Sequence, residues 1–243
     1  KSTPDFKMDP NSLDALKAGL RWLKPQWKAV YGKEQHRMLN VFEICNGIQF
    51  GPYKGGAEGL DRQASPGLPF TSIHCSNSKS AYLALDDLNG KMIKIWSNTR
   101  QTQEFLDHVH FMQSVIMAGC LPVTFFKGSM KAELISKSLG PKARLFCAGG
   151  MDLQYFSSMF YGTFAAAVKM NYHEMECQVG VDPVRTLTLA WHRMMKMDGG
   201  YICTDFSRYD KLLPLEIMTM IKDTVIDIIM SNLALPSRDF SDT

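Results

Sequence analysis

The sequence of 243 residues lacks several features that would define a class of protein. Its six cysteines show no CxxC pair and no regular spacing, which argues against a zinc site built on paired cysteines and against a disulfide framework. No secretory hydrophobic region stands near the start, so the thiols are expected to be reduced. No apolar run approaches the roughly 20 residues that cross a bilayer, and no direct membrane span is expected.

The ends and the charge balance also carry little information. The sequence starts at Lys1 rather than at a methionine, and the segment 235–243 is polar, which together predict a piece of a longer polypeptide. The 27 basic and 24 acidic residues give a net charge of +3, which is too small to indicate a nucleic-acid-binding protein by itself. The hydrophobic content of 45% can fill the core of one large domain or of two small ones.

Two carboxylates follow a predicted short strand. The β-favouring segment 201–204 comes after a turn at 197–200, and it places Asp205 at the end of the strand, with Asp210 five residues later. A carboxylate at a strand end is held rigidly, and Mg²⁺ prefers one or two such oxygens together with substrate phosphates. Asp205 is therefore a candidate Mg²⁺ ligand, although two aspartates at this spacing, taken alone, are commoner in solvated turns.

A helix is predicted directly after this acidic pair. Pro214 suits the first turn of a helix, and the apolar residues that follow it recur at helical spacing. They are Leu215, Met218, Ile221, Val225 and Ile228. Strand, acidic turn and packed helix thus form one predicted unit.

Basic residues cluster in the middle of the sequence. Residues 127–144 contain five cations and a single acid, Glu133. The cations are Lys127, Lys131, Lys137, Lys142 and Arg144. Such a cluster forms either the solvated face of a hairpin or a channel whose fixed cations attract a triphosphate and neutralise charge during phosphoryl transfer.

A stiff loop is predicted ahead of the basic cluster, over residues 51–70. Pro66 and Pro69 restrict its backbone, while Gly67 permits a close backbone approach by a ligand or by another segment of the chain. A tight surface loop would use the same residues, so both interpretations stay open on this pattern alone.

Apolar periodicity predicts packing elements elsewhere. Helices are expected over residues 11–31, within 38–50 and ending near Asn46, and over 102–118 and 151–170; a strand is expected over 91–96. We expect Pro25 to interrupt the first helix. We also expect this helix to pack on the core through one apolar stripe, formed by Leu13, Leu16, Leu20, Leu23 and Trp27.

Pairs of metal-binding residue types occur without a matching second pair. They are His74 with Cys75, His108 with His110, and His173 with Cys177. A zinc site needs about four ligands, so these pairs are interpreted as packing or surface residues.

The acidic unit resembles motif A of the RNA-dependent RNA polymerases of the picornavirus-like group, in which an Asp, four residues and a second Asp precede a helix opened by a proline. The lead-in Gly180-Val181-Asp182-Pro183, with Trp191 after it, is similar to that group as well. The resemblance implies that Asp205 binds catalytic Mg²⁺, with Mn²⁺ as the alternative ion. It implies that Asp210 senses the ribose 2′-hydroxyl.

The basic cluster resembles motif F of the same polymerases. Lys131, Glu133, Lys142 and Arg144 match its pattern and would bind the incoming nucleotide, with Glu133 holding Arg144 by a charge-assisted hydrogen bond. Ile135 departs from the pattern because many relatives have a basic residue there, and the loop is shorter than theirs.

The stiff loop is similar to motif G, the Ser-x-Gly-x-Pro segment that borders the path of the template. Ser65, Gly67 and Pro69 match it and would lie against RNA. The three motifs occur in the order G, F, A, as the family requires.

The resemblance implies an α+β chain with the right-hand polymerase fold. Residues 1–146 would be fingers and residues 147–243 the start of an antiparallel palm, while motifs B and C and the thumb are absent from the sequence. Template-directed RNA synthesis by two-metal nucleotidyl transfer would then be incomplete in this chain.

The resemblance also implies partners and a location. The partners would be an RNA template and primer, nucleoside triphosphates, and the remaining palm and thumb on the same longer chain or on a second chain. The protein would work in the host cytoplasm within a viral replication complex. Two alternatives stay open: a non-catalytic RNA-binding or assembly module derived from a polymerase, and an unrelated metal-dependent phosphotransferase that uses Asp205.

Overall fold

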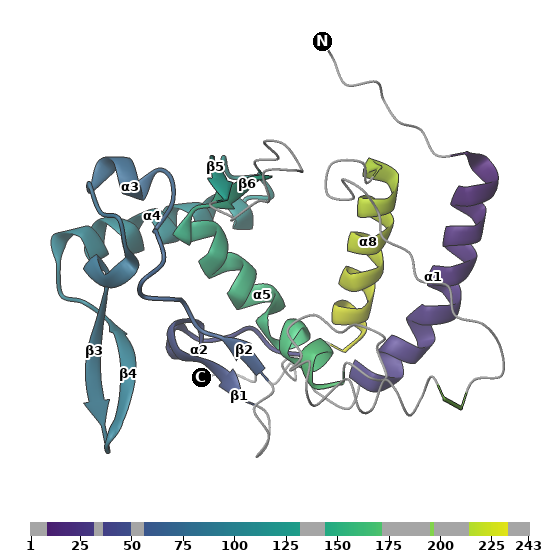
Figure 1. Ribbon diagram of the computed structural model, residues 1–243, viewed down its shortest axis with the longest axis horizontal. Coiled ribbons are helices and arrows are strands. Elements are labelled where there is room, and N and C mark those ends of the chain that lie inside the picture. Colours follow the sequence, from purple (N-terminus) through teal and green to yellow (C-terminus); the bar gives the residue numbers. More distant parts are fainter. Residues whose placement is uncertain are drawn as a thin grey trace, which may run out of the picture. The chain divides into compact units, whose positions relative to one another are not determined.

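The computed structural model of the chain forms two compact units, which are described separately (Figure 1). The structure describes residues 9–31, 36–49, 56–131, 144–171, 195–196 and 214–232. The helical unit comprises Lys1–Arg37, Phe50–Gly55 and Phe164–Thr243. The mixed unit comprises Met38–Gln49 and Gly56–Thr163.

Helix α1, Pro10–Tyr31, belongs to the helical unit and confirms the helix predicted over residues 11–31. Its predicted apolar stripe is confirmed too, since all five of those side chains are half-buried while most of the helix is exposed. The predicted interruption is wrong, because Pro25 lies inside one continuous helix. The axis of α1 instead bends along its course (Figure 1), which fits a residue that removes one helical hydrogen bond without ending the helix.

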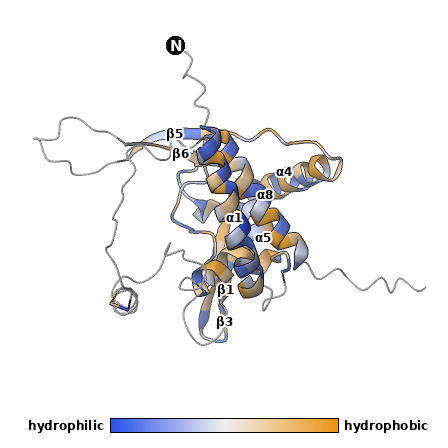
Figure 2. Ribbon diagram, turned by 90° about the vertical axis from the view of Figure 1, so that its right-hand side faces the viewer, coloured by the Kyte–Doolittle hydropathy of each residue, from blue (hydrophilic) through white to orange (hydrophobic). Residues whose placement is uncertain are grey.

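Helix α8, Leu215–Ser231, confirms the helix predicted after Pro214, which occupies the position just before it. The ribbons of α1 and α8 both carry hydrophilic and hydrophobic residues, as amphipathic helices do (Figure 2). The core of the helical unit consists of Val30, Tyr31, Phe164, Ala167, Ile228 and Ile229. Tyr31 and Phe164 meet edge to face, with ring centroids 5.2 Å apart.

His36 contacts the residues that end α1 and that follow α8. Its backbone N–H donates to the carbonyl oxygen of Asn232, 3.1 Å away, directly after α8. Its ring Nδ1 contacts the hydroxyl of Tyr31. Burial lowers the pKa of His36, because the charged imidazolium would lose its hydration.

The mixed unit begins with a short capped helix and a short hairpin. Helix α2, Val41–Asn46, starts at a reciprocal capping box in which Asn40 Oδ1 accepts from the Glu43 N–H and Glu43 Oε2 accepts from the Asn40 N–H. The helix predicted to end near Asn46 is thus confirmed. Strands β1, Gly47–Gln49, and β2, Gly56–Glu58, pair antiparallel.

Two longer hairpins follow. Strand β3, Leu83–Leu88, pairs antiparallel with β4, Lys91–Trp96, which confirms the predicted strand at 91–96. Asn89 and Gly90 form their two-residue turn with φ values of 55° and 78°, as a type I′ turn requires. Strands β5, Phe126–Lys131, and β6, Arg144–Gly149, form the third antiparallel pair.

The remaining elements of the mixed unit are helices and one 3₁₀ turn. Helix α3 spans Phe70–Ile73, the 3₁₀ turn η1 spans Lys79–Ala81, and α4 spans Arg100–Met117. Helix α5, Met151–Met170, starts in this unit and continues into the other. The helices predicted over 102–118 and 151–170 are therefore confirmed, and none of the described helices is long and apolar enough to cross a membrane.

Candidate functional site

The predicted template loop, Ser65–Pro69, is a tightly hydrogen-bonded turn that leads into α3. Gly67 has φ +72°, a conformation that favours glycine. The Ser65 hydroxyl accepts from the Gly67 N–H at 3.2 Å, and the Thr71 hydroxyl donates to the Gly67 carbonyl oxygen at 2.9 Å. Pro66 is buried while Ser65 is exposed, so the loop presents the serine at the surface.

The loop is fixed to the end of the predicted nucleotide hairpin. The N–H of Met151, at the start of α5, donates to the carbonyl oxygen of Pro66 at 2.8 Å. Gly149 and Gly150, which end β6 and precede α5, lie against the backbone of the loop. The structure therefore brings the loop against the end of β6 that lies about eighty residues later in the sequence, at the opposite end of the β5–β6 hairpin from Lys131 and Arg144.

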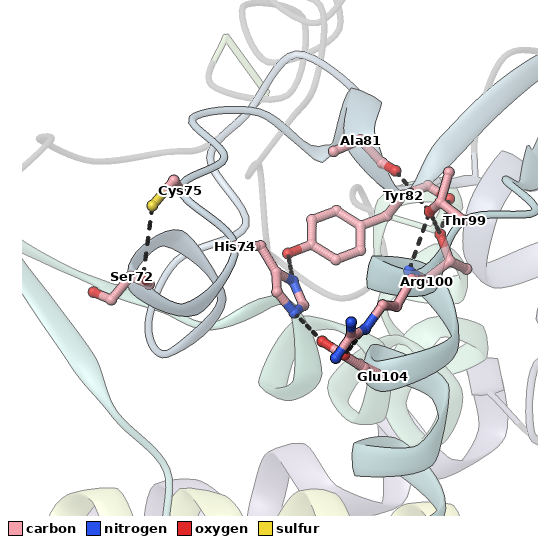
Figure 3. A network of polar contacts seen from close by, with 9 residues as sticks. Ser72, His74, Cys75, Ala81, Tyr82, Thr99, Arg100 and Glu104 are labelled. Atoms are coloured by element: carbon pink, nitrogen blue, oxygen red, sulfur yellow. Dashed lines mark hydrogen bonds and ion pairs between the residues drawn. The ribbon is translucent and has the colours of Figure 1, made fainter.

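A polar network braces the helix that follows the loop (Figure 3). His74 Nε2 lies 2.8 Å from Glu104 Oε2 on α4, and His74 Nδ1 lies 2.6 Å from the hydroxyl of Tyr82. Because an ionised carboxylate only accepts, Nε2 carries a proton in this contact, and Nδ1 accepts the Tyr82 proton when the ring is neutral. Arg100 completes the network by donating to Glu104 Oε1 at 2.7 Å.

Burial and hydrogen bonding shift the pKa values of two groups in this network. Tyr82 is fully buried, and this, followed by the nearby Glu104 charge, raises its pKa to about 12. The hydrogen bonds from Arg100 and then from His74 lower the pKa of Glu104. Among the described residues, no three or more His, Cys, Asp and Glu side chains form a group that could hold a metal ion.

Aromatic and acidic groups hold the loop from its other side. Phe70, directly after the loop, packs edge to face on Phe105 and His108, with centroid distances of 5.1 and 5.4 Å. His108 Nε2 lies 3.2 Å from Oδ2 of the buried Asp152, at the start of α5. The loop thus sits on a rigid support contributed by α3, α4 and α5.

Two of the predicted nucleotide residues, Lys131 and Arg144, fall at the end of the β5–β6 hairpin that lies away from the loop. The strand register places Lys131 directly opposite Arg144, so two of the four predicted residues occupy one cross-strand position. Lys127 is exposed on β5, four residues earlier. Glu133 and Lys142 lie outside the described residues, as do Asp205 and Asp210.

Sequence reasoning did not single out a cavity that lies beside the loop. It has a volume of about 350 Å³ and is lined by Glu58, Gly59, Leu60, Asp61, Ala64, Lys79, Gln154, Ser157 and Ser158. Lys79 is only 1% exposed, and it lines this cavity. Burial lowers the pKa of Lys79, and the charge of Asp61 opposes that shift.

No local pattern in the sequence marks these additional residues. Lys79 sits in a polar segment typical of a surface turn, and its burial results from packing against residues distant in the chain. The dipeptide Gly149-Gly150 is a turn signal in the sequence. Nothing in the sequence indicates that these glycines contact the loop at residues 65–69.

Comparison with known proteins assigns the chain to a family. The family described as viral RNA-dependent RNA polymerase matches residues 23–238, and the chain belongs to this family. The predicted resemblance to viral polymerases is confirmed at this level.

The fold comparison gives the same result. The chain is similar to the Sicinivirus 3Dpol RNA-dependent RNA polymerase, with a TM-score of 0.64 and 19% sequence identity over 88% of this chain. The similar region spans 41% of the Sicinivirus polymerase. The predicted α+β class and right-hand polymerase fold are thereby confirmed, and no curated protein matches the sequence.

Proposed function

We propose that this chain supplies the fingers and the start of the palm of a viral RNA-dependent RNA polymerase, with residues 1–146 as fingers and 147–243 as palm. The observation that carries the proposal is the junction of the Ser65–Pro69 loop with the β5–β6 hairpin, in a chain of this family. The complete protein would synthesise RNA on an RNA template from nucleoside triphosphates in the infected host cell, in the cytoplasm.

The template and the nucleotide would be held by different parts of this site. Ser65, Gly67 and Pro69 would border the template strand, with the exposed Ser65 at the loop surface. Lys131 and Arg144, paired in the hairpin register, would bind the triphosphate together with Lys142. Fixed cations at this place stabilise the charge that develops during phosphoryl transfer without having to reorganise. Glu133 would hold the guanidinium of Arg144.

The acidic residues would serve the chemistry and the choice of sugar. Asp205 would hold Mg²⁺, or Mn²⁺ in its place, because carboxylate oxygens are the ligands such hard cations prefer. The bound ions would supply activation of the primer 3′-hydroxyl and stabilisation of the pyrophosphate leaving group. Asp210 would accept a hydrogen bond from the ribose 2′-hydroxyl and so favour ribonucleotides.

The test is the substitution Asp205→Asn in the complete polymerase. Primer extension on a heteropolymeric RNA template with Mg²⁺ should fall below detection, while RNA binding stays within about twofold of the unsubstituted protein, because RNA binding depends mainly on contacts between cations and phosphates. Asp223→Asn is the matched control, since Asp223 is an exposed carboxylate on α8. Its extension rate should be unchanged.

Two outcomes would contradict the proposal. Undiminished extension by Asp205→Asn would remove Asp205 from the metal site. RNA binding without extension by the complete unsubstituted protein would favour the non-catalytic RNA-binding module instead.

A further inference from the structure

The glycines at the end of β6 pack against the Ser65–Pro69 loop with almost no free space. A Cβ atom on Gly67 would lie 2.8 Å from the carbonyl oxygen of Gly149 and 2.9 Å from Cα of Gly150. From the hairpin side, a Cβ atom on Gly150 would lie 2.4 Å from the carbonyl oxygen of Leu68. These three neighbours are backbone atoms, so they cannot turn aside as the end of a flexible side chain would; a Cβ atom on Gly150 would also clash with Oδ1 of the Asp152 side chain.

This contact is anchored on both sides. The hydrogen bond from the Met151 N–H to the Pro66 carbonyl oxygen ties the loop to the residue after the glycine pair, and Met151 is fully buried. On the hairpin side, Gly149 pairs with Phe126, and β6 continues without a break to Arg144 at its other end. The loop and the nucleotide hairpin therefore meet at one close-packed junction.

We propose that Gly67, Gly149 and Gly150 are positioning residues that couple the template-bordering loop to the nucleotide-binding hairpin. This inference rests on the proposed function. Close-packed backbone transmits displacement, and a paired strand is held along its length by its ladder of hydrogen bonds. A shift of the loop at Gly149 therefore moves the strand that carries Arg144, so template position and nucleotide binding change together.

Coupling of this kind acts in both directions. If the position of the template changes the affinity for the nucleotide, the nucleotide changes the affinity for the template by the same factor. A substitution in the loop should thus alter nucleotide binding, although no loop residue is proposed to touch the nucleotide. A substitution at the hairpin side of the junction should alter template binding.

The decisive variant is Gly67→Ala, compared with Gly119→Ala. Both glycines have a positive φ, 72° and 76°, so alanine is strained to a similar extent at either position. They differ in surroundings, because a Cβ atom on Gly119 would meet no atom within 4 Å. The pair therefore separates backbone strain from the contact with Gly149 and Gly150.

Both variants should be measured in the complete polymerase by single-nucleotide incorporation at varied nucleotide concentration. We expect the apparent KM for the nucleotide to rise at least about threefold in Gly67→Ala, because small misplacements far from the chemistry have large kinetic effects. Gly119→Ala should keep the KM of the unsubstituted enzyme. A loss of folded protein lowers the rate without changing KM, so a merely structural role is distinguished.

Gly150→Ala tests the same contact from the hairpin side. It serves as the test of the coupling between loop and hairpin if Gly67→Ala does not fold. We expect it to weaken binding of template RNA relative to Gly119→Ala. A nucleotide KM in Gly67→Ala equal to that of Gly119→Ala, or unchanged template affinity in Gly150→Ala, would overturn the coupling while leaving the proposed function intact. Absence of extension by the unsubstituted polymerase would instead overturn the proposed function, and this inference with it.

Discussion

Lys79 is a lysine that is almost completely buried in the mixed unit. A buried ammonium loses its hydration, and hydrogen bonds or an ion pair normally compensate that loss. The charge of Asp61 opposes the effect of burial on Lys79 but does not cancel it, because the pKa of Lys79 is still lowered. Its ammonium should therefore reduce the free energy of unfolding at neutral pH.

The first prediction concerns Lys79→Met, which keeps most of the side-chain volume and removes the charge. We expect the variant to be more stable than the unsubstituted protein at pH 7 by about 1 kcal/mol or more, since buried charges replaced by apolar groups of similar size often give gains of this order. Thermal unfolding measures the difference. Lys91→Met, at an exposed position on β4, is the control and should change little.

The pH dependence of this gain follows from the direction of the pKa shift. The pKa of Lys79 is lower in the folded state than its ordinary value of 10.5, so between the two pKa values the unfolded chain binds more protons and stability rises with pH. The advantage of Lys79→Met should therefore be full below the folded-state pKa and shrink as the pH rises toward 10.5. A destabilised variant at pH 7 would show that a polar partner compensates the ammonium.

Sequence reasoning recognised residues by local pattern and missed those defined by packing. Ser65, Gly67 and Pro69 were identified because a short motif contains them. Lys79 was not, because burial of a lysine depends on segments that are distant along the chain and leaves no mark on its own neighbours.

The β5–β6 hairpin is the element on which the nucleotide proposal depends. Its register places Lys131 and Arg144 opposite each other at one end of the hairpin. Lys127 lies at the other end of β5, opposite Ala148. Arg144, at one end of the hairpin, is therefore the position to test for nucleotide binding, and Lys127, at the other end, is the control.

The prediction for this element is that Arg144→Ala weakens nucleotide binding in the complete polymerase. Loss of a hydrogen bond to a charged group costs about 1.5–3 kcal/mol. Because each 1.4 kcal/mol is about tenfold in affinity, the apparent KM for the nucleotide should rise by about tenfold or more. Lys127→Ala should change it far less. Equal kinetics for Arg144→Ala and the unsubstituted enzyme would identify the hairpin as a merely solvated face.

The elements themselves were predictable where their periodicity was long. Helices α4 and α5 and strand β4 follow from apolar spacing, as does α8 behind Pro214. Strand β3 was missed, although Asn89-Gly90 is a strong hairpin signal, because Asp86 and Asp87 disturb its apolar alternation. Strands β1 and β2 are too short for any period to show. The continuity of α1 through Pro25 reflects packing of its apolar stripe, which outweighs one lost hydrogen bond.

At the scale of the whole molecule, the order of the motifs carried the identification. Composition and net charge fit many globular proteins, whereas three motifs in the order G, F, A fit one family, and that family matches residues 23–238. The junction between the loop and the hairpin could not be predicted, because it depends on how segments about eighty residues apart pack together. The similar region covers 41% of the Sicinivirus polymerase, so the predicted absence of motifs B and C from this sequence is the subject of the final test.

The last prediction compares the 243-residue chain with a longer polypeptide that continues beyond it. If the proposed two-metal mechanism holds, catalysis needs carboxylates from motif C as well as Asp205, so the chain alone should bind RNA through its basic hairpin but give no primer extension. The longer polypeptide should extend the primer, and Asp205→Asn within it should not, which ties the recovered activity to this chain. RNA binding by the short chain should weaken steeply with salt, because phosphate contacts release counterions. Extension by the short chain alone would mean that a second carboxylate within these residues completes the metal site, and Asp210 would be the first to substitute.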